Sequence, residues 1–114
     1  MTAEQVVQKQ LDAYNSRDLS RFMETMDKEV QLFNFSDGEL LAEGFENVKA
    51  IYKNLFDKSP KLHSNLTNRI VLGDQVIDHE TITGRMGNDS PIELVVIYEV
   101  RLEKIYKITV MRKS

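Results

Sequence analysis

The 114-residue sequence contains no cysteine and no tryptophan, and only two prolines and five glycines. A chain without cysteine forms neither a disulfide scaffold nor a thiolate zinc site. The sequence also lacks any apolar run of the roughly 18–20 residues that a membrane-spanning helix needs. Its opening segment, MTAEQVVQKQ, is polar and unlike a signal peptide. We therefore expect a cytoplasmic protein with no membrane partner.

An excess of basic residues is also missing. The chain carries 15 Lys+Arg against 18 Asp+Glu, a formal net charge of −3, whereas nucleic-acid binding needs a clustered basic face. A chain of this length buries roughly two-thirds of its unfolded surface, which is enough for one modest core. We expect a single domain over residues 1–114 and no nucleic-acid partner.

The first half of the chain carries helix signals. Thr2 and Gln5 have the spacing of a capping box at the start of a first helix. Either Asp18 or Ser20 can cap a second, short helix, and Ser59-Pro60 ends a third. Two short strand candidates lie between the second and third helices: residues 30–35 and 39–43.

The second half carries strand signals, separated by turns as in antiparallel hairpins. The four strand candidates are residues 62–72, 75–86, 91–102 and 105–112. Three of them are about twice the usual length of ~5–6 residues, and long antiparallel strands twist and bend. The element order ααββαββββ therefore predicts an α+β fold, in which a cone-shaped, curved antiparallel sheet packs against three N-terminal helices and leaves a pocket between them.

Three segments of the chain have the pattern of a known superfamily. They are LDAYNSRDLSRFMETMDKEVQLF, EGFENVKAIYKNLF and YEVRLEKIYKITVMR. On these segments the chain resembles the nuclear-transport-factor-2-like superfamily, in its SnoaL-like and ketosteroid-isomerase-like branch. The resemblance implies a curved sheet with a pocket, and a homodimer. It does not imply one reaction, because this fold carries isomerases, cyclases, dehydratases, hydrolases and non-catalytic binders.

The resemblance also bears on individual positions. The ketosteroid isomerases of this branch use an Asp base, with a Tyr and a protonated Asp as oxyanion donors. The position of the base corresponds to Asn34, whose amide cannot act as a base. The protonated Asp corresponds to Tyr98, and a supporting tyrosine of the third helix to Tyr52. The oxyanion tyrosine would lie near Gln10, and Tyr14 follows one turn later. The resemblance thus implies these three tyrosines and the asparagine as ligand-binding residues, without the usual base.

A second source of acid–base chemistry is the run Asp78-His79-Glu80 within one strand candidate. Strand side chains alternate between faces, so Asp78 and Glu80 share one face and His79 points to the other. Either the carboxylate pair or the histidine then lines the pocket as the catalytic acid or base. In the alternative, the charged face is solvated or paired with basic residues of neighbouring strands. Those residues are Arg69, Arg85, Arg101 and Lys107.

The chain offers little for a metal ion or a cofactor. Its only histidines are His63 and His79, which with a carboxylate could in principle bind a metal. No HExxH or similar helical ligand spacing accompanies them, and no phosphate-binding glycine loop is present. We expect neither a metal nor a cofactor.

The strand candidate 91–102 is apolar on both faces as far as residue 97. One face would meet the helices, but no element of this short chain is left to cover the other. An exposed apolar patch of this kind marks an interface. We therefore expect a homodimer through the open face of the sheet, with Arg69, Glu99 and Arg101 as candidates for ion pairs between subunits.

Three functions stay open at this point. The first is a cofactor-free isomerase, cyclase, dehydratase or hydrolase that acts on a small apolar carbonyl compound. A residue of the 78–80 run would move the proton, and Tyr14, Tyr52 or Asn34 would hold the oxyanion. The second is a binding module with the same pocket and no chemistry. The third is a dimerisation or interaction domain whose pocket is filled by its own side chains.

Overall fold

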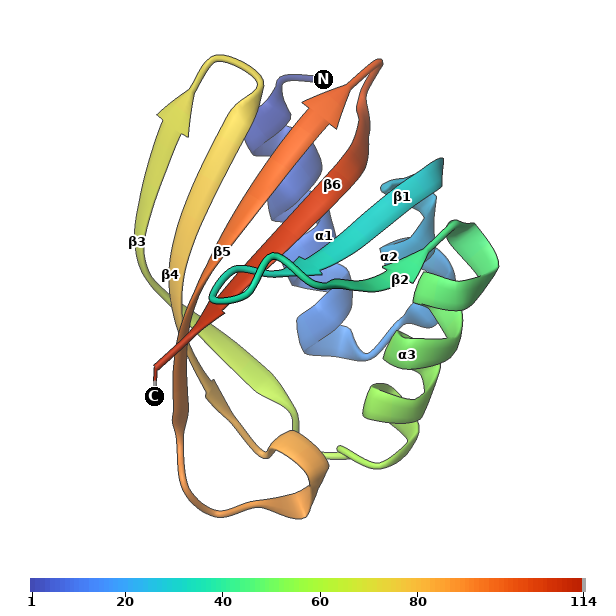
Figure 1. The fold of residues 1–114 in the computed structure, drawn as a ribbon. Helices are drawn as coiled ribbons and strands as arrows, with labels where there is room; N and C mark the ends of the chain where they lie inside the picture. The colour runs from blue at the N-terminus through green and yellow to red at the C-terminus, as the bar shows by residue number, and fades with distance from the viewer. Residues whose placement is uncertain (114) are drawn as a thin grey trace.

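The structure is a computed structural model that describes residues 1–113 (Figure 1). Within this range the chain forms three α-helices, six β-strands and one short 3₁₀ helix. The helices are α1 (Ala3–Ser16), α2 (Leu19–Glu24) and α3 (Phe45–Asp57). The strands are β1 (Met26–Asn34), β2 (Leu40–Glu43), β3 (His63–Leu72), β4 (Gln75–Thr83), β5 (Ile92–Arg101) and β6 (Lys104–Arg112). The 3₁₀ helix η1 (Arg85–Gly87) lies between β4 and β5.

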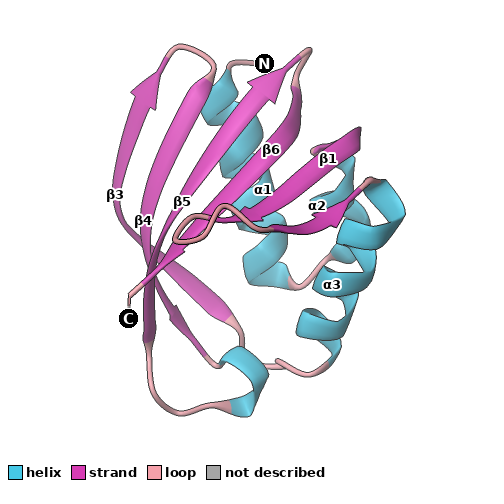
Figure 2. Ribbon diagram, in the orientation of Figure 1, coloured by secondary structure: helices cyan, strands magenta, loops and turns pink. Residues whose placement is uncertain are grey.

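The strands form one curved sheet that wraps around the helices (Figure 2). Their order is β2-β1-β6-β5-β4-β3, and the helices lie on the concave side, so the predicted α+β class and element order are confirmed. Neighbouring strands are antiparallel except β1 and β6, which run parallel. The sequence pattern did not reveal this pair, because two strands far apart in the chain carry no local signal of how they meet.

Local side-chain bonds set the starts of the helices. Thr2 and Gln5 form the predicted capping box of α1: the Gln5 N–H donates to Thr2 Oγ1 (3.2 Å), and the Thr2 N–H donates to Gln5 Oε1 (2.9 Å). Of the two candidates for the second cap, Asp18 caps α2 by accepting a hydrogen bond from the Arg21 N–H (3.1 Å). Each cap satisfies a backbone donor that the first turn leaves free.

Strand β4 is shorter than predicted because the chain turns early. Gly84 has a φ of +72°, and a Cβ at this position would lie 2.3 Å from the Lys61 carbonyl oxygen. Only glycine combines this conformation with so close an approach. The predicted strand 75–86 therefore ends at Thr83, and residues 84–91 form the connection that carries η1.

The core lies between the helices and the concave face of the sheet. On that face, alternate residues of β4 and β5 are buried. Beneath the helices, four aromatic rings from α1, α2 and α3 pack with centroids 4.5–6.3 Å apart: Tyr14, Phe22, Tyr52 and Phe56. Aromatic pairs at these distances stabilise the packing beyond their buried area, so this cluster fixes α3 against the other two helices.

A set of side-chain bonds joins the end of α1 to the start of β3. Asn15 Nδ2 donates to the Ser64 carbonyl oxygen (3.1 Å), and Asn15 Oδ1 accepts from the Ser64 N–H (2.8 Å). Arg17, with a left-handed φ of 52°, donates from Nη1 to the Leu62 carbonyl oxygen (2.6 Å). These bonds, which we call the α1–β3 clamp, hold Ser64 in place on the concave face of the sheet.

We expect Asn15→Ala to lower the free energy of unfolding by about 1–3 kcal/mol, because it leaves two partly buried backbone groups of Ser64 unpaired. Urea-induced unfolding measures the change. Asn47→Ala is the matched control, since it removes one exposed hydrogen bond to the Glu43 carbonyl oxygen and should change stability by less than about 0.5 kcal/mol. Equal effects of the two substitutions would contradict the clamp.

Candidate functional site

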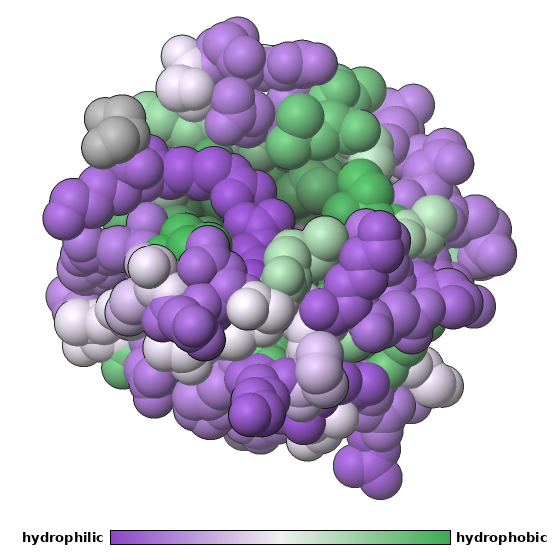
Figure 3. Space-filling view, turned by 90° about the horizontal axis from the view of Figure 1, so that it is seen from below, coloured by the Kyte–Doolittle hydropathy of each residue, from purple (hydrophilic) through white to green (hydrophobic). Residues whose placement is uncertain are grey.

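A cavity of about 210 Å³ lies between the concave face of the sheet and helices α1 and α3. Its exposed apolar lining residues, Leu41, Ile51 and Met86, come from β2, α3 and η1, so the mouth lies between these elements. A view from below shows hydrophobic residues lining a hollow with hydrophilic residues around it (Figure 3). The volume is below the range of about 300–1,000 Å³ typical of sites for drug-sized ligands, so this cavity fits a small molecule.

The lining of the cavity divides into an apolar and a polar set. The apolar residues are Leu32, Leu41, Ile51, Leu55, Ile82, Met86, Leu94, Val96 and Val110. The polar residues are Gln10, Tyr14, Tyr52, Asn54, Glu80, Arg85, Tyr98 and Arg112. A mostly apolar wall with a few convergent polar groups is the usual composition of a small-molecule site.

Glu80 is the carboxylate that lines this cavity. Its side chain extends from β4 and is only 4% exposed, and Glu80 Oε1 accepts a hydrogen bond from the buried Ser64 Oγ (2.5 Å). Burial raises the pKa of Glu80 from 4.5 to about 7, and the neighbouring charge of Asp78 adds to this rise. The Ser64 hydrogen bond and the positive charge of Arg69 oppose it. A carboxyl group with such a pKa both gives up and accepts a proton near neutral pH.

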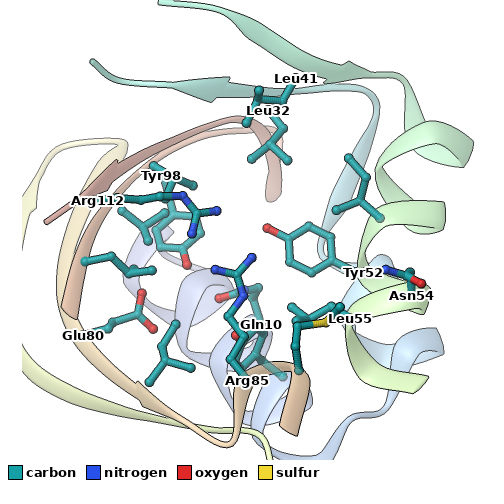
Figure 4. A pocket seen from close by; sticks show the side chains of 17 residues that line it. Gln10, Leu32, Leu41, Tyr52, Asn54, Leu55, Glu80, Arg85, Tyr98 and Arg112 are labelled. Atoms are coloured by element: carbon teal, nitrogen blue, oxygen red, sulfur yellow. The ribbon is translucent and has the colours of Figure 1, made fainter. Parts of the chain in front are cut away.

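Three tyrosines reach the cavity from three different elements: Tyr14 from α1, Tyr52 from α3 and Tyr98 from β5. In Figure 4 the Tyr52 ring points across the cavity, and Tyr98 lies on the sheet side. Within residues 1–113 none of the three hydroxyls has a protein hydrogen-bond partner. Burial raises the pKa of each, to about 12 for Tyr52. All three hydroxyls therefore stay protonated and can donate to a bound molecule.

Gln10 adds an unsatisfied polar group at the inner wall. Its side chain is 4% exposed on α1, and in the described part of the chain Gln10 Oε1 has no hydrogen-bond partner. A buried polar atom without a partner costs free energy unless something else satisfies it. The resemblance predicted that the family's oxyanion tyrosine would lie near Gln10, and it gave the glutamine itself no role. Its place one helical turn before Tyr14 would have put both on the same face.

Arg85 and Arg112 lie at the mouth, from η1 and from the end of β6 (Figure 4). Partial burial and the nearby Arg85 lower the pKa of Arg112. The sequence pattern predicted Arg85 only as a partner for the carboxylates of β4, and it gave no prediction for Arg112. Alternation along β6 from the buried Ile108 would have placed Arg112 on the concave face.

Asp78, a predicted catalytic residue, is not among the residues that line the cavity. It is 1% exposed and forms a bidentate ion pair with Arg69. In this pair Arg69 Nε donates to Asp78 Oδ1 (2.7 Å) and Arg69 Nη2 donates to Asp78 Oδ2 (2.9 Å). Arg69 Nη1 also donates to Gln8 Oε1 of α1 (2.8 Å). Both carboxylate oxygens of Asp78 thus accept hydrogen bonds from Arg69. The bond from Arg69 to Gln8 holds α1 to the sheet.

His79 and Asn34 also lie outside the cavity. The register of β4 turns His79 to the convex face, where its Nε2 lies 2.5 Å from Glu93 Oε2. Asn34 ends β1, and its amide donates to Ser36 Oγ (3.1 Å) and Asp37 Oδ1 (2.9 Å) in the turn that follows. Of the β1 residues, Leu32 lines the cavity and Asn34 does not.

The ionic residues proposed to pair between subunits have partners within the chain. Arg69 pairs with Asp78 on the concave face, so its placement at an outer interface was wrong. Glu99 lies 3.6 Å from Lys107, and Arg101 lies 3.8 Å from Asp27.

Residues 1–113 contain neither a membrane-spanning helix nor a cluster of metal ligands. No helix there is both long enough and apolar enough to cross a bilayer. No three His, Asp or Glu side chains there gather closely enough to hold a metal ion.

A curved sheet closed on one side by helices, around a small cavity with a buried carboxyl group, defines an α+β cone. The chain belongs to the SnoaL-like domain family, whose pattern it matches over residues 7–108. The predicted superfamily is therefore confirmed. A sequence search of the curated proteins found no match.

Solved structures share the fold at low sequence identity. An uncharacterised cystatin-fold protein from Novosphingobium aromaticivorans is 20% identical, with a TM-score of 0.88 over 98% of this chain and 99% of that one. A SnoaL-like protein of unknown function from Burkholderia thailandensis is 18% identical, with a TM-score of 0.79 over 98% and 94%. A protein with a ketosteroid-isomerase-like fold from Catenulispora acidiphila, solved with trimethylamine, is 15% identical, with a TM-score of 0.75 over 92% and 82%. At these identities the likeness extends to the fold alone.

The raised pKa of Glu80 makes stability depend on pH. The folded state holds this proton more tightly than the unfolded chain, so the stabilisation is complete below about pH 4.5 and is lost as the pH rises through about 7. The loss amounts to about 3 kcal/mol in the free energy of unfolding. Glu80→Gln should remove it, as measured by urea unfolding between about pH 4 and pH 8.

Glu93→Gln is the matched control for this experiment. Glu93 lies on the convex face, and its hydrogen bonds with His79 and Lys113 lower its pKa, whereas burial raises the pKa of Glu80. The control variant should keep the loss of stability between pH 4.5 and 7. If wild type and Glu80→Gln showed the same pH dependence, the raised pKa of Glu80 would be refuted.

Proposed function

We propose that this chain binds a small organic molecule in the cavity and catalyses proton transfer on it, with Glu80 as the acid–base group. The observation that carries the proposal is the placement of Glu80: a buried carboxyl group with a pKa of about 7, in a cavity that three tyrosine hydroxyls also line. Perturbed carboxyl groups in a cavity are characteristic of catalytic sites.

The proposed chemistry follows from the roles that these groups can take. Ionised Glu80 removes a proton from a carbon next to a carbonyl group. The electron pair of the broken C–H bond forms a C=C bond, and the π pair of the carbonyl group moves to its oxygen. The hydroxyls of Tyr14, Tyr52 and Tyr98 donate hydrogen bonds to the oxygen as its negative charge grows. Protonated Glu80 then returns the proton to another atom of the same molecule. The net result is an isomerisation that consumes no oxidant, reductant or cofactor.

One observation favours a second candidate, a binding module without chemistry. The position of the family's base is occupied by Asn34, whose side chain is held in a turn outside the cavity. The third possibility, a pocket filled by the chain's own side chains, is disfavoured by the open volume of about 210 Å³.

Deuterium exchange distinguishes catalysis from binding. Cyclohexanone incubated with the protein in D₂O should gain deuterium at its α-carbons faster than in buffer, as followed by proton NMR. Glu80→Gln should lower this rate by about 10²-fold or more, whereas Glu93→Gln on the convex face should leave it unchanged. Binding of the ketone without faster exchange would contradict the catalytic proposal and support the binding module.

We also propose that the chain forms a homodimer through the convex face of the sheet. The strand register lines up apolar side chains across this face: Ile70 opposite Ile77, Ile77 opposite Ile97, and Val95 opposite Met111. No helix within residues 1–113 covers this face (Figure 1). A second copy of the chain would cover these apolar side chains with its own copy of the same surface, as two-fold symmetry requires.

Sedimentation velocity at micromolar concentration should show a dimer. Ile97→Glu should convert it to a monomer, because the substitution places a charge in the middle of the buried row. The matched substitution Ile51→Glu, at an exposed position of α3, should leave the dimer intact. A wild-type protein that sediments as a monomer would overturn the proposed interface.

A further inference from the structure

The mouth of the cavity carries two positive charges that have no partner in the described chain. The guanidinium groups of Arg85 and Arg112 project into the cavity (Figure 4). Within residues 1–113, no carboxylate lies within ion-pair distance of either group. Other arginines do have such partners: Arg69 contacts Asp78, and Arg101 contacts Asp27. Arg21 contacts Asp18, and Arg17 donates to the backbone carbonyl oxygens of Asn15 and Leu62. Within residues 1–113, Arg85 and Arg112 are therefore the arginines whose side chains have neither a hydrogen bond nor an ion pair with the chain.

The fold holds both arginines at this place. Arg85 follows Gly84, where a Cβ would lie 2.3 Å from the Lys61 carbonyl oxygen, and the Met86 N–H donates to Oγ of the fully buried Ser59 (2.8 Å). Arg112 lies opposite Leu94 in the register of β6 and β5, so its side chain starts from the concave face of the sheet. Both side chains begin at fixed backbone positions and converge on one volume.

Two like charges that converge in a partly buried volume repel one another and weaken the fold. The pKa of Arg112 is lowered by partial burial and by Arg85, which reflects this repulsion. A bound anion between the two groups would relieve it. Charge arrangements that cost stability and serve no internal contact are characteristic of binding sites.

We propose that Arg85 and Arg112 bind the carboxylate of a small organic acid whose apolar body occupies the cavity. This inference rests on the proposed function and specifies its class of substrate. Guanidinium groups match the planar carboxylate with paired N–H donors. Phosphate sites usually add a nest of free backbone N–H groups, but two backbone donors of this turn are already engaged: the Met86 N–H with Ser59, and the Asn88 N–H with the Arg85 carbonyl oxygen (2.9 Å).

The far end of the ligand would meet the inner polar groups. Gln10 Oε1 is buried without a partner in the described residues, so it can accept a hydrogen bond from a hydroxyl group of the ligand. Glu80 lines the same cavity, and the charges that act on its pKa are those of Asp78 and Arg69. An acid anchored at the mouth therefore presents its other end to the acid–base group. The substrate expected from the sequence was apolar, whereas the cavity fits an amphipathic anion.

Matched neutral and anionic probes test this assignment. Isothermal titration calorimetry would compare phenylacetate with phenylacetamide, which has nearly the same shape and no charge. We expect phenylacetate to bind at least tenfold more tightly. Arg85→Gln and Arg112→Gln should each weaken phenylacetate binding by about tenfold, the effect of one lost charge-assisted contact, and leave phenylacetamide binding unchanged. Arg21→Gln, at an exposed arginine of α2, is the control and should change neither.

The remaining outcomes separate this inference from the proposed function. Equal affinities for the acid and the amide would overturn the carboxylate site while leaving the cavity a ligand site. Tighter binding of phenyl phosphate than of phenylacetate would replace the carboxylate with a phosphoryl group and overturn the assignment. Failure of every probe to bind at millimolar concentration would overturn both the carboxylate site and the proposed function. A thermal melt controls for folding, because neither glutamine variant should melt below wild type.

Discussion

The register of β4 against its neighbours is the constraint on which the site depends. Alternation along this strand sends Asp78 and Glu80 to the concave face and His79 to the convex face. Position along the strand then separates the two carboxylates, because Asp78 lies within reach of Arg69 and Glu80 lies within reach of Ser64. Three consecutive polar residues thereby acquire three different environments. A shift of one residue would exchange them and place an imidazole in the cavity.

The fold could be predicted from local patterns because each element carries its own signal. The capping box at Thr2, the breaker at Pro60 and the turn at Gly73 mark where helices and strands begin and end. The parallel pairing of β1 with β6 had no such signal, since it depends on how distant segments meet. Strand alternation predicted that Asp78 and Glu80 share one face. It did not predict which of the two carboxylates would pair with an arginine. That choice depends on the β3–β4 pairing, which sets Arg69 opposite Asp78.

Pocket residues were predictable only in part, for the same reason. Tyr14, Tyr52 and Tyr98 were identified because the family resemblance pointed to these positions. Arg112 looked like an ordinary charged residue at the end of a strand. Alternation along β6 puts it on the same face as Ile108, and the β5–β6 register places it opposite Leu94 of the cavity wall. The cavity is consequently polarised. Cationic groups gather at its mouth, and a carboxyl group that burial keeps largely uncharged up to about pH 7 lies on the sheet-side wall.

The glycine at position 84 has a consequence for how such a site can change. Any side chain there would place a Cβ 2.3 Å from the Lys61 carbonyl oxygen, so the backbone of one of the two segments would have to shift. Position 84 is therefore restricted to glycine, while the side chain of Met86 in the same turn is exposed. A change of ligand preference in such a chain would then come from substituted side chains around the mouth of the cavity, with Gly84 retained.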